Sequence, residues 1–289
     1  MTENSENFAA AREILDTMVM HVEFERALIG ADEATRLVAE LGNPSGVLVT
    51  ADPGMGKTLW LELVKVKARK HFVNMTNEDP VLHVAFDALV DLPKVASLFM
   101  KALGFPMLSQ RTSLDSMTNM VDTAMDRLKP RVVLIDEAQH VCEGARDITA
   151  RAVTDWLKRR MDLHCLMVVL TGTKTLSRLR DINPQFSSRV SGDYLINTFT
   201  YGDAWHQLLG GVADGVKKVD LGTLRDKRVS KRLYTGTKGN LRCLKKWLAR
   251  ASLCASQGGR RAVLATDLEL GFDAEFGANT SIANPFKEV

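Results

Sequence analysis

Residues Gly46–Leu63 read GVLVTADPGMGKTLWLEL, the run of the chain that is most informative about its fold. Val47–Val49 is a short, β-branched apolar run of the kind that forms a buried strand. Asp52–Gly54 then predicts a tight turn, and Gly56–Thr58 precedes a helical pattern. A strand, a glycine-rich turn and a helix start, in this order, predict a loop that binds nucleotide phosphates.

The loop residues have distinct expected roles. Backbone amides in a tight turn point toward an anion, the ammonium of Lys57 reaches the outer phosphates, and the hydroxyl of Thr58 binds Mg²⁺. The usual pattern has glycine where this chain has Ala51, a residue small enough to fit. The alternative is a glycine-rich turn that binds nothing. The residues predicted to contact nucleotide are Asp52, Pro53, Gly54, Met55, Gly56, Lys57, Thr58 and Leu59.

The composition is that of an ordinary soluble protein. Of 289 residues, 45% are hydrophobic and 25% are charged. The first ten residues are polar and acidic, without a secretory signal, and the most apolar run, Leu163–Leu170, is too short to cross a bilayer. The four cysteines and six histidines lack metal-ligand spacing. We expect a cytoplasmic protein with no membrane partner and reduced thiols.

Charge is unevenly distributed along the chain. Residues 1–40 contain three basic and nine acidic residues, whereas residues 217–250 contain twelve basic and two acidic residues, a net charge of +10. Such a segment suits an anionic polymer such as nucleic acid. A solvated helical surface is the alternative.

Apolar runs at 81–86, 131–137 and 165–170 predict three further strands, each separated from the next by helical patterns. Strands alternating with helices indicate a parallel α/β sheet that binds ligands at its carboxyl edge. Helical patterns dominate after Ala204. We therefore expect four parts, namely an N-terminal helical segment (1–45), an α/β ATPase core (46–200), a helical lid (201–276) and a tail (277–289).

Asp136 and Glu137 are the last two residues of the strand predicted at 131–137, and Asp136 lies 79 residues after Lys57. A carboxylate at the end of such a strand can hold Mg²⁺, and the next one can orient and polarise an attacking water. Together with the phosphate loop, the pair predicts a site that binds ATP or GTP.

The run from Asp136 to His140 (DEAQH), with the phosphate loop, resembles the AAA+ transposition ATPases of the TniB/TnsC group, and more distantly MuB and the IstB-type proteins. Gln139 separates it from the DEAH box of helicases. The resemblance covers roughly residues 20 to 255. It implies an α/β AAA+ P-loop ATPase core with a parallel sheet, followed by a small α-helical lid domain, with ATP and Mg²⁺ as cofactors.

The resemblance also implies roles for residues outside the two motifs. Thr173 lies where such ATPases keep a polar sensor of the γ-phosphate, with Thr171 as the alternative. Arg189 looks like an arginine finger that reaches a neighbouring subunit's nucleotide, and Arg242 resembles a second sensor on the lid helix. Simple strand-end capping for the threonines and ordinary surface positions for the arginines are the alternatives.

In related ring and filament ATPases, loops of the α/β domain contact DNA. Here Lys94, Lys101 and Arg111 follow the second strand and could contact the phosphate backbone. They carry no base-specific pattern, so DNA binding should depend on salt but little on sequence. Ordinary surface charge is the alternative.

The function implied is that of an ATP-dependent, sequence-nonspecific DNA-binding regulator of transposition. It would form a ring or helical filament on double-stranded DNA, recruit a transposase with a target-selection protein, and use hydrolysis as an assembly and disassembly switch. A helicase loader or replication initiator is one alternative, although the lid leaves little room for a helix-turn-helix domain. A signalling NTPase that binds no DNA is another, against which the basic segment argues.

Overall fold

A computed structural model describes residues 3–73, 78–105, 112–144, 147–277 and 283–287 of the chain. The chain divides into two units. An α/β unit comprises Val22–Pro53 and Lys57–Ile196. A helical unit comprises Met1–His21, the loop residues Gly54–Gly56 and Asn197–Val289.

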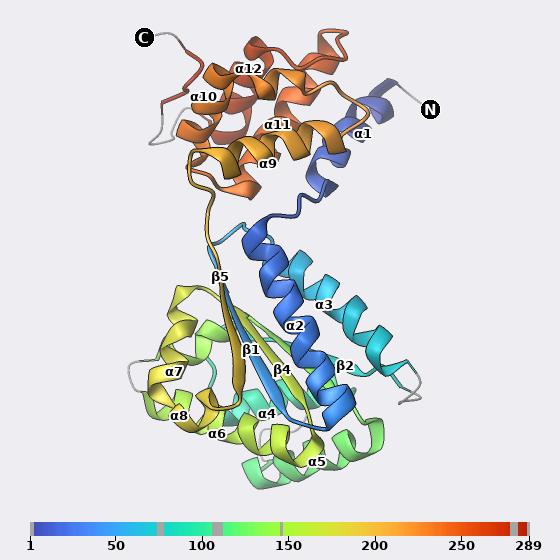
Figure 1. Ribbon diagram of the computed structural model, residues 1–289, viewed down its shortest axis with the longest axis vertical. Helices are drawn as coiled ribbons and strands as arrows, with labels where there is room; N and C mark the ends of the chain where they lie inside the picture. Colours follow the sequence, from blue (N-terminus) through green and yellow to red (C-terminus); the bar gives the residue numbers. More distant parts are fainter. Residues whose placement is uncertain (1–2, 74–77, 106–111, 145–146, 278–282, 288–289) are drawn as a thin grey trace. The chain divides into compact units, whose positions relative to one another are not determined.

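The α/β unit is built on one parallel sheet of five strands in the order β2-β3-β4-β1-β5 (Figure 1). Its strands are β1 (Ser45–Ala51), β2 (Val81–Ala85), β3 (Val132–Asp136), β4 (Met167–Gly172) and β5 (Val190–Ile196). β1 lies between β4 and β5, and all seven of its residues are buried. A strand covered on both faces reads as a continuous apolar run, which is why the sequence pattern revealed it.

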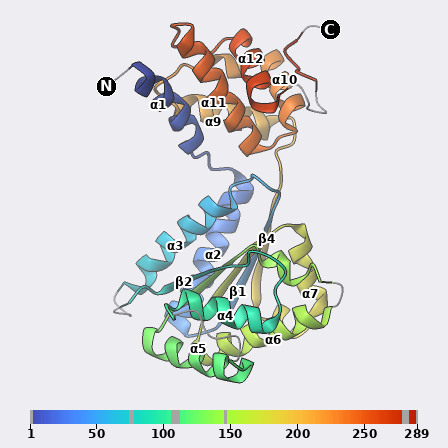
Figure 2. The same cartoon turned by 180° about the vertical axis from the view of Figure 1, so that it is seen from behind.

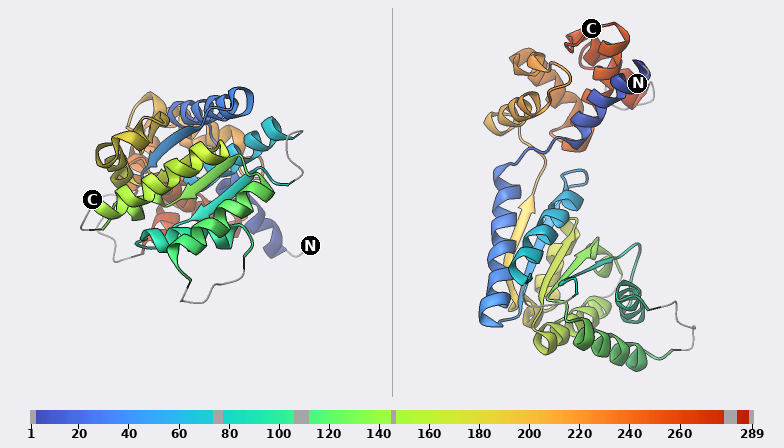
Figure 3. Two further views of the ribbon diagram at one scale, coloured as in Figure 1. Left: turned by 90° about the horizontal axis from the view of Figure 1, so that it is seen from below. Right: turned by 90° about the vertical axis from the view of Figure 1, so that its right-hand side faces the viewer.

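Helices cover both faces of this sheet (Figure 3). α2 (Val22–Leu41) and α3 (Lys57–Phe72) lie on one face. α4 (Leu92–Ala102), α5 (Leu114–Leu128) and α6 (Asp147–His164) lie on the other. The short helices α7 (Leu179–Ile182) and α8 (Pro184–Ser187) precede β5, and the 3₁₀ turns η1 (Ala138–Val141) and η2 (Lys174–Arg178) follow β3 and β4. This is the layered arrangement expected for an α/β fold.

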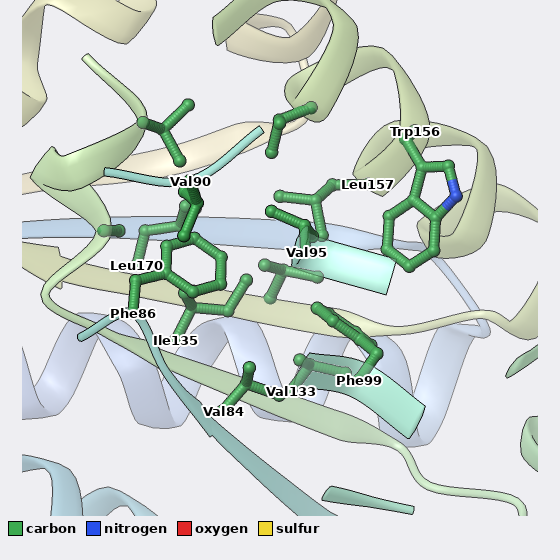
Figure 4. Close-up of a cluster of buried hydrophobic side chains, with 14 of the residues drawn as sticks. Val84, Phe86, Val90, Val95, Phe99, Val133, Ile135, Trp156, Leu157 and Leu170 are labelled. Atoms are coloured by element: carbon green, nitrogen blue, oxygen red, sulfur yellow. The ribbon is translucent and has the colours of Figure 1, made fainter. Parts of the chain in front are cut away.

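The main core lies between the sheet and helices α4 to α6 (Figure 4). Phe86, directly after β2, and Ile135 of β3 are fully buried. Phe99 of α4 packs edge-on against Trp156 of α6 with ring centroids 5.0 Å apart. Truncating one such aromatic side chain to alanine typically costs about 3–5 kcal/mol. The core therefore holds the carboxyl ends of the strands in a fixed arrangement.

The strands predicted at 81–86 and 131–137 are one and two residues longer than β2 and β3, and larger differences occur at the fourth and fifth strands. The fourth strand begins at Met167 rather than at Cys165, because Cys165 adopts a left-handed backbone conformation (φ 52°) that ends the preceding helix. The fifth strand, β5, was not predicted at all. Only one of its residues, Ile196, is buried, so its sequence lacks the apolar run that identified the other strands.

Helices make up the C-terminal part of the second unit (Figure 2). They are α9 (Asp203–Gly215), the turn η3 (Gly222–Arg225), α10 (Lys227–Thr237), α11 (Leu241–Gln257) and α12 (Ala265–Phe276). Trp247 of α11 is fully buried, and its indole N–H donates to the carbonyl of Leu268 at 2.7 Å. Phe286, near the C-terminal end, lies edge-on to Trp247 with ring centroids 5.7 Å apart.

The N-terminal helix α1 (Glu3–Asp16) belongs to this helical unit. The ammonium of Lys245 donates to the carbonyl of Leu15 at 2.9 Å, and the carboxylate of Glu13 accepts from the amide of Lys218 at 2.8 Å. Burial lowers the pKa of Lys245, while the charge of Asp16 acts in the opposite direction. The unit therefore joins segments from the two ends of the sequence.

Candidate functional site

The loop after β1 has the backbone of a phosphate-binding turn. Gly54 and Gly56 both adopt positive φ angles, 85° and 89°, which side chains with a Cβ rarely tolerate. Met55 between them is fully buried. Lys57 is the first residue of α3, so the free amides at the start of this helix follow the turn directly. These features fit a polyphosphate anion.

Lys57 and Glu137 meet at the carboxyl edge of the sheet. The ammonium nitrogen of Lys57 lies 3.4 Å from Oε1 of Glu137. Partial burial raises the pKa of Glu137, but the hydrogen bond from Gln139 and the positive charge of Lys57 outweigh it and hold the pKa below its ordinary value. Glu137 is therefore a carboxylate at neutral pH, as a residue that polarises water must be.

Asp136 is fixed by two hydrogen bonds to a single oxygen. Its Oδ1 accepts from the hydroxyl of Thr171 on β4 at 2.7 Å and from the amide of Glu137 at 2.9 Å. In the described part of the chain no hydrogen bond goes to Oδ2, which stays available as an acceptor. The hydroxyl-bearing residue Thr58 is exposed near the start of α3. Hard oxygen donors of this kind fit Mg²⁺, and Thr58 and Asp136 are the residues that would hold it.

The two threonines considered as γ-phosphate sensors, Thr171 and Thr173, make different hydrogen bonds. Thr171 is fully buried and holds Asp136, as described above. Thr173, after the end of β4, is partly exposed, and its amide donates to the side chain of Gln139 at 3.2 Å. Lys174 next to it pairs with Asp52 of the phosphate loop, with 3.2 Å between Nζ and Oδ1. The sensor role stays a proposal for Thr173.

Sequence reasoning missed the contacts of Gln139. Its carboxamide nitrogen donates to Oε2 of Glu137 at 2.6 Å, while its oxygen accepts from Thr173. The residue is buried, with 4% of its surface exposed. The signal in the sequence was the glutamine two residues after Glu137, which above only distinguishes this motif from a DEAH box.

Arg189 lies at the opposite end of the sheet. It immediately precedes β5, whose first residue, Val190, pairs with Gly46 at the amino end of β1. The phosphate loop follows the carboxyl end of β1, about 20 Å away for a strand of this length. Arg189 pairs with Asp162 at 2.9 Å, and both side chains are more than one third exposed. Within one chain, Arg189 is therefore not brought to Lys57.

Arg242 is exposed near the start of α11, in the helical unit. Its amide donates to the carbonyl of Gly54 at 3.2 Å. A Cβ on Gly54 would lie 2.8 Å from the Cβ of Arg242, so a residue without a side chain is needed for this approach. Two other cations on α11, Lys246 and Arg250, both pair with Glu275 and are thereby partly neutralised.

A family model described as "Bacterial TniB protein" matches residues 8–197, more than half of the chain. The chain belongs to the TniB family. This confirms the resemblance drawn from the phosphate loop and the DEAQH run. No curated protein matches the chain.

Solved structures place this TniB-family chain in the AAA+ fold. It is similar to the ORC2 protein of Aeropyrum pernix, solved as ADPNP-ADP complexes, with 15% identity, a TM-score of 0.67, and coverage of 93% of this chain and 73% of that one. For Cdc6p from Pyrobaculum aerophilum the values are 15%, 0.64, 91% and 70%. For a point variant of RuvB from Thermotoga maritima they are 11%, 0.52, 86% and 68%. The expected AAA+ core followed by a helical lid is confirmed.

The TniB-family chain carries two of its three predicted DNA contacts on α4. Lys94 and Lys101 are both exposed and lie seven residues apart, two turns along one helix face. Arg111 lies outside the described residues. Among those described, no helix is long and apolar enough to span a membrane, and no group of three or more His, Cys, Asp or Glu side chains forms a metal site.

Proposed function

We propose that this protein is an ATP-dependent, sequence-nonspecific DNA-binding regulator of transposition. It binds ATP with Mg²⁺, assembles as a ring or filament on double-stranded DNA, and recruits a transposase together with a target-selection protein. One observation carries the proposal. In a TniB-family chain, Lys57 and Glu137 are 3.4 Å apart at the carboxyl edge of a parallel sheet, next to a phosphate-binding loop.

The residues of the site have separate roles in the proposed hydrolysis. Lys57 leaves Glu137 to bind the outer phosphates, and Glu137 orients a water in line with the γ-phosphorus. A bond forms between the water oxygen and phosphorus, and the bond from phosphorus to the β–γ bridging oxygen breaks. One proton of the water passes to Glu137 and on to solvent, and the other stays on the inorganic phosphate. ADP and inorganic phosphate are the products. Thr58 and Asp136 would hold Mg²⁺, and the bound ion would neutralise part of the phosphate charge.

The remaining assigned residues act between the site and its surroundings. Arg189 acts on the nucleotide of a neighbouring subunit. It does not act on the nucleotide of its own chain, because the phosphate loop of that chain lies at the other end of β1. Arg242 and Thr173 contact phosphate as sensors. Lys94 and Lys101 contact the DNA backbone, and their ammonium groups read no base, so affinity falls with added salt. ATP then serves as a switch, since assembly depends on a nucleotide shared between subunits.

A helicase loader or replication initiator is the second candidate. The similarity to ORC and Cdc6 proteins favours it, and one of these neighbours, ORC1 of Aeropyrum pernix, was solved in complex with DNA. At 16% identity or less, however, this likeness concerns the fold alone. The family match favours the transposition role. A signalling NTPase without DNA is the third candidate, and the segment of net charge +10 argues against it.

Electron microscopy of the purified protein with double-stranded DNA tests the proposal directly. Samples contain no nucleotide, ADP or a non-hydrolysable ATP analogue. We expect rings or filaments on DNA only with the ATP analogue, and pull-down of a transposase by that assembly. Particles that form equally in all samples would exclude an assembly that depends on ATP. No DNA binding at all would also exclude the proposal and would favour the signalling alternative.

A further inference from the structure

Gln139 connects the ends of two neighbouring strands through its side chain. It lies in the turn η1 after β3, and both polar atoms of its carboxamide are bonded. The nitrogen Nε2 donates to Oε2 of Glu137 at 2.6 Å, and Oε1 accepts from the backbone amide of Thr173, after β4, at 3.2 Å. Because the side chain is buried, water cannot replace either bond cheaply.

The chemistry of the two partners fixes the orientation of this amide. The backbone N–H of Thr173 can only donate, so it must meet the oxygen of Gln139. The carboxylate of Glu137 can only accept, so it must meet the nitrogen. Turning the amide over would place oxygen against oxygen and N–H against N–H. The side-chain amide of Gln139 therefore has one favourable orientation, in which its N–H group donates to Glu137.

Space for this connection comes from Gly172, the last residue of β4. A Cβ at this position would lie 2.5 Å from Oε1 of Gln139 and 3.1 Å from its backbone nitrogen. Real Cβ contacts are not this short, so any other residue at 172 would displace the carboxamide. The strand end and the glutamine side chain are thus matched in shape as well as in hydrogen bonding.

The two oxygens of Glu137 have different partners. Oε2 is held by Gln139, whereas Oε1 faces the ammonium of Lys57 at 3.4 Å. In the proposed function Lys57 is the side chain that moves to the phosphates when nucleotide binds. Only Oε1 then loses its partner, while Oε2 keeps the bond from Gln139.

We propose that Gln139 is a positioning residue that holds Oε2 of Glu137, so that Oε1 is the oxygen that accepts the hydrogen bond from the attacking water. This inference rests on the proposed ATPase function, and it gives a role to Gln139, a residue without one in that proposal. Glu137 has a left-handed backbone (φ 53°) and a side chain that is 41% exposed. Without Gln139 its carboxylate would sample several rotamers, and misplacement of a general base slows the chemical step rather than substrate binding.

Two variants separate the two ends of the connection. Gln139→Leu fills the same space and removes both hydrogen bonds. Gln139→Glu keeps an acceptor for the Thr173 amide but replaces the donor to Glu137 with an oxygen. We expect each to lower kcat about 10- to 100-fold, with the dissociation constant for a non-hydrolysable ATP analogue and the thermal midpoint of Gln139→Glu near wild type.

A double-variant test distinguishes positioning from a general structural effect. If Gln139 acts through Glu137, adding Gln139→Leu or Gln139→Glu to Glu137→Gln should cause no further loss in single-turnover ATP hydrolysis. Variants within about twofold of wild-type kcat, or losses that multiply fully in the Glu137→Gln background, would overturn the inference. A wild-type protein that hydrolyses no ATP on DNA would overturn the proposed ATPase function itself, so the two failures are told apart in one assay.

Discussion

The hydroxyl of Thr171, fully buried on β4, donates a 2.7 Å hydrogen bond to Oδ1 of Asp136 at the end of β3. Because the two strands are neighbours in a parallel sheet, their carboxyl ends meet at one edge. The bond fixes the carboxylate that would hold Mg²⁺, and it uses only one of the two oxygens. Thr171 therefore supports the proposed metal position without needing to touch phosphate.

Replacing Thr171 with valine should weaken ATP turnover about 10-fold or more, because valine has nearly the same shape but cannot donate a hydrogen bond worth about 1.5–3 kcal/mol to a charged acceptor. Thr171→Ser, which keeps the hydroxyl, is the matched control and should stay near wild type. Steady-state kinetics over a range of Mg²⁺ concentrations measure the effect. Equal turnover in the two variants would show that the bond is unimportant for Asp136.

Lys57→Ala should lower ATP affinity about 10- to 150-fold, because the ammonium contributes a charged hydrogen bond of about 1.5–3 kcal/mol to the phosphates. Equilibrium binding of a fluorescent ATP analogue measures the loss. Lys65→Ala is a suitable control, since that lysine lies two turns further along α3 and pairs with Glu62. Unchanged affinity in Lys57→Ala would remove this loop from the nucleotide site.

Arg189→Ala should leave ATP binding intact but reduce turnover of the assembled protein by about 10³-fold, the typical effect of losing an arginine finger. The pair with Asp162 is exposed and contributes little to folding. Asp162→Ala breaks the same 2.9 Å pair while keeping the arginine, so its turnover should be normal.

Mixing the inactive variants provides the decisive check on Arg189. A subunit with Arg189→Ala keeps Glu137, and a subunit with Glu137→Gln keeps Arg189. Where the two meet in the right order, a complete site forms, so the mixture should hydrolyse ATP faster than either variant alone. No recovery on mixing would argue that Arg189 does not act on a neighbouring subunit.

Lys94→Ala combined with Lys101→Ala should reduce the dependence of DNA affinity on salt, with the slope of log affinity against log salt falling by about 1 for each lost phosphate contact. Binding to two unrelated duplexes should weaken equally. Lys246→Ala is the matched control, because that lysine is already paired with Glu275. If Lys246→Ala changes the slope more than the double variant, the DNA-contacting surface lies in the helical unit instead.

Asp226 offers a test of pH dependence in the helical unit. Hydrogen bonds from the amides of Val229 and Arg228 at the start of α10 lower the pKa of Asp226. A lowered pKa in the folded state means that the stabilisation is present above the unfolded value of about 3.9 and disappears as pH falls through the lower folded value.

Asp226→Ala should therefore lower the thermal midpoint near pH 7, and the difference from wild type should shrink below about pH 3.9. Asp226→Asn is the control, since asparagine caps helices about as well and does not titrate. Circular dichroism melts across this range measure both. A difference that stays constant on acidification would show that the carboxylate charge does not contribute.

Several features of the fold could be read locally. β1 and β3 are buried on both faces and appear as continuous apolar runs. The glycines before Lys57 predict a turn that needs positive φ angles. Each of these signals lies within a few consecutive residues. β5 was missed because its residues are mostly half-exposed and leave no such run.

Local sequence was enough to predict the parallel α/β core, the phosphate loop, the acidic pair at 136–137 and the helical C-terminal region. Each follows from periodicity or from a short run of residues with special backbone demands. Which distant groups meet became known from the three-dimensional packing of these elements. The hydrogen bond from the amide of Thr173 to Gln139, the pair of Arg189 with Asp162 and the packing of α1 in the helical unit join residues 27 or more positions apart. Nothing local in a helix or a turn specifies its partner, since contact is set by how whole elements pack their apolar faces.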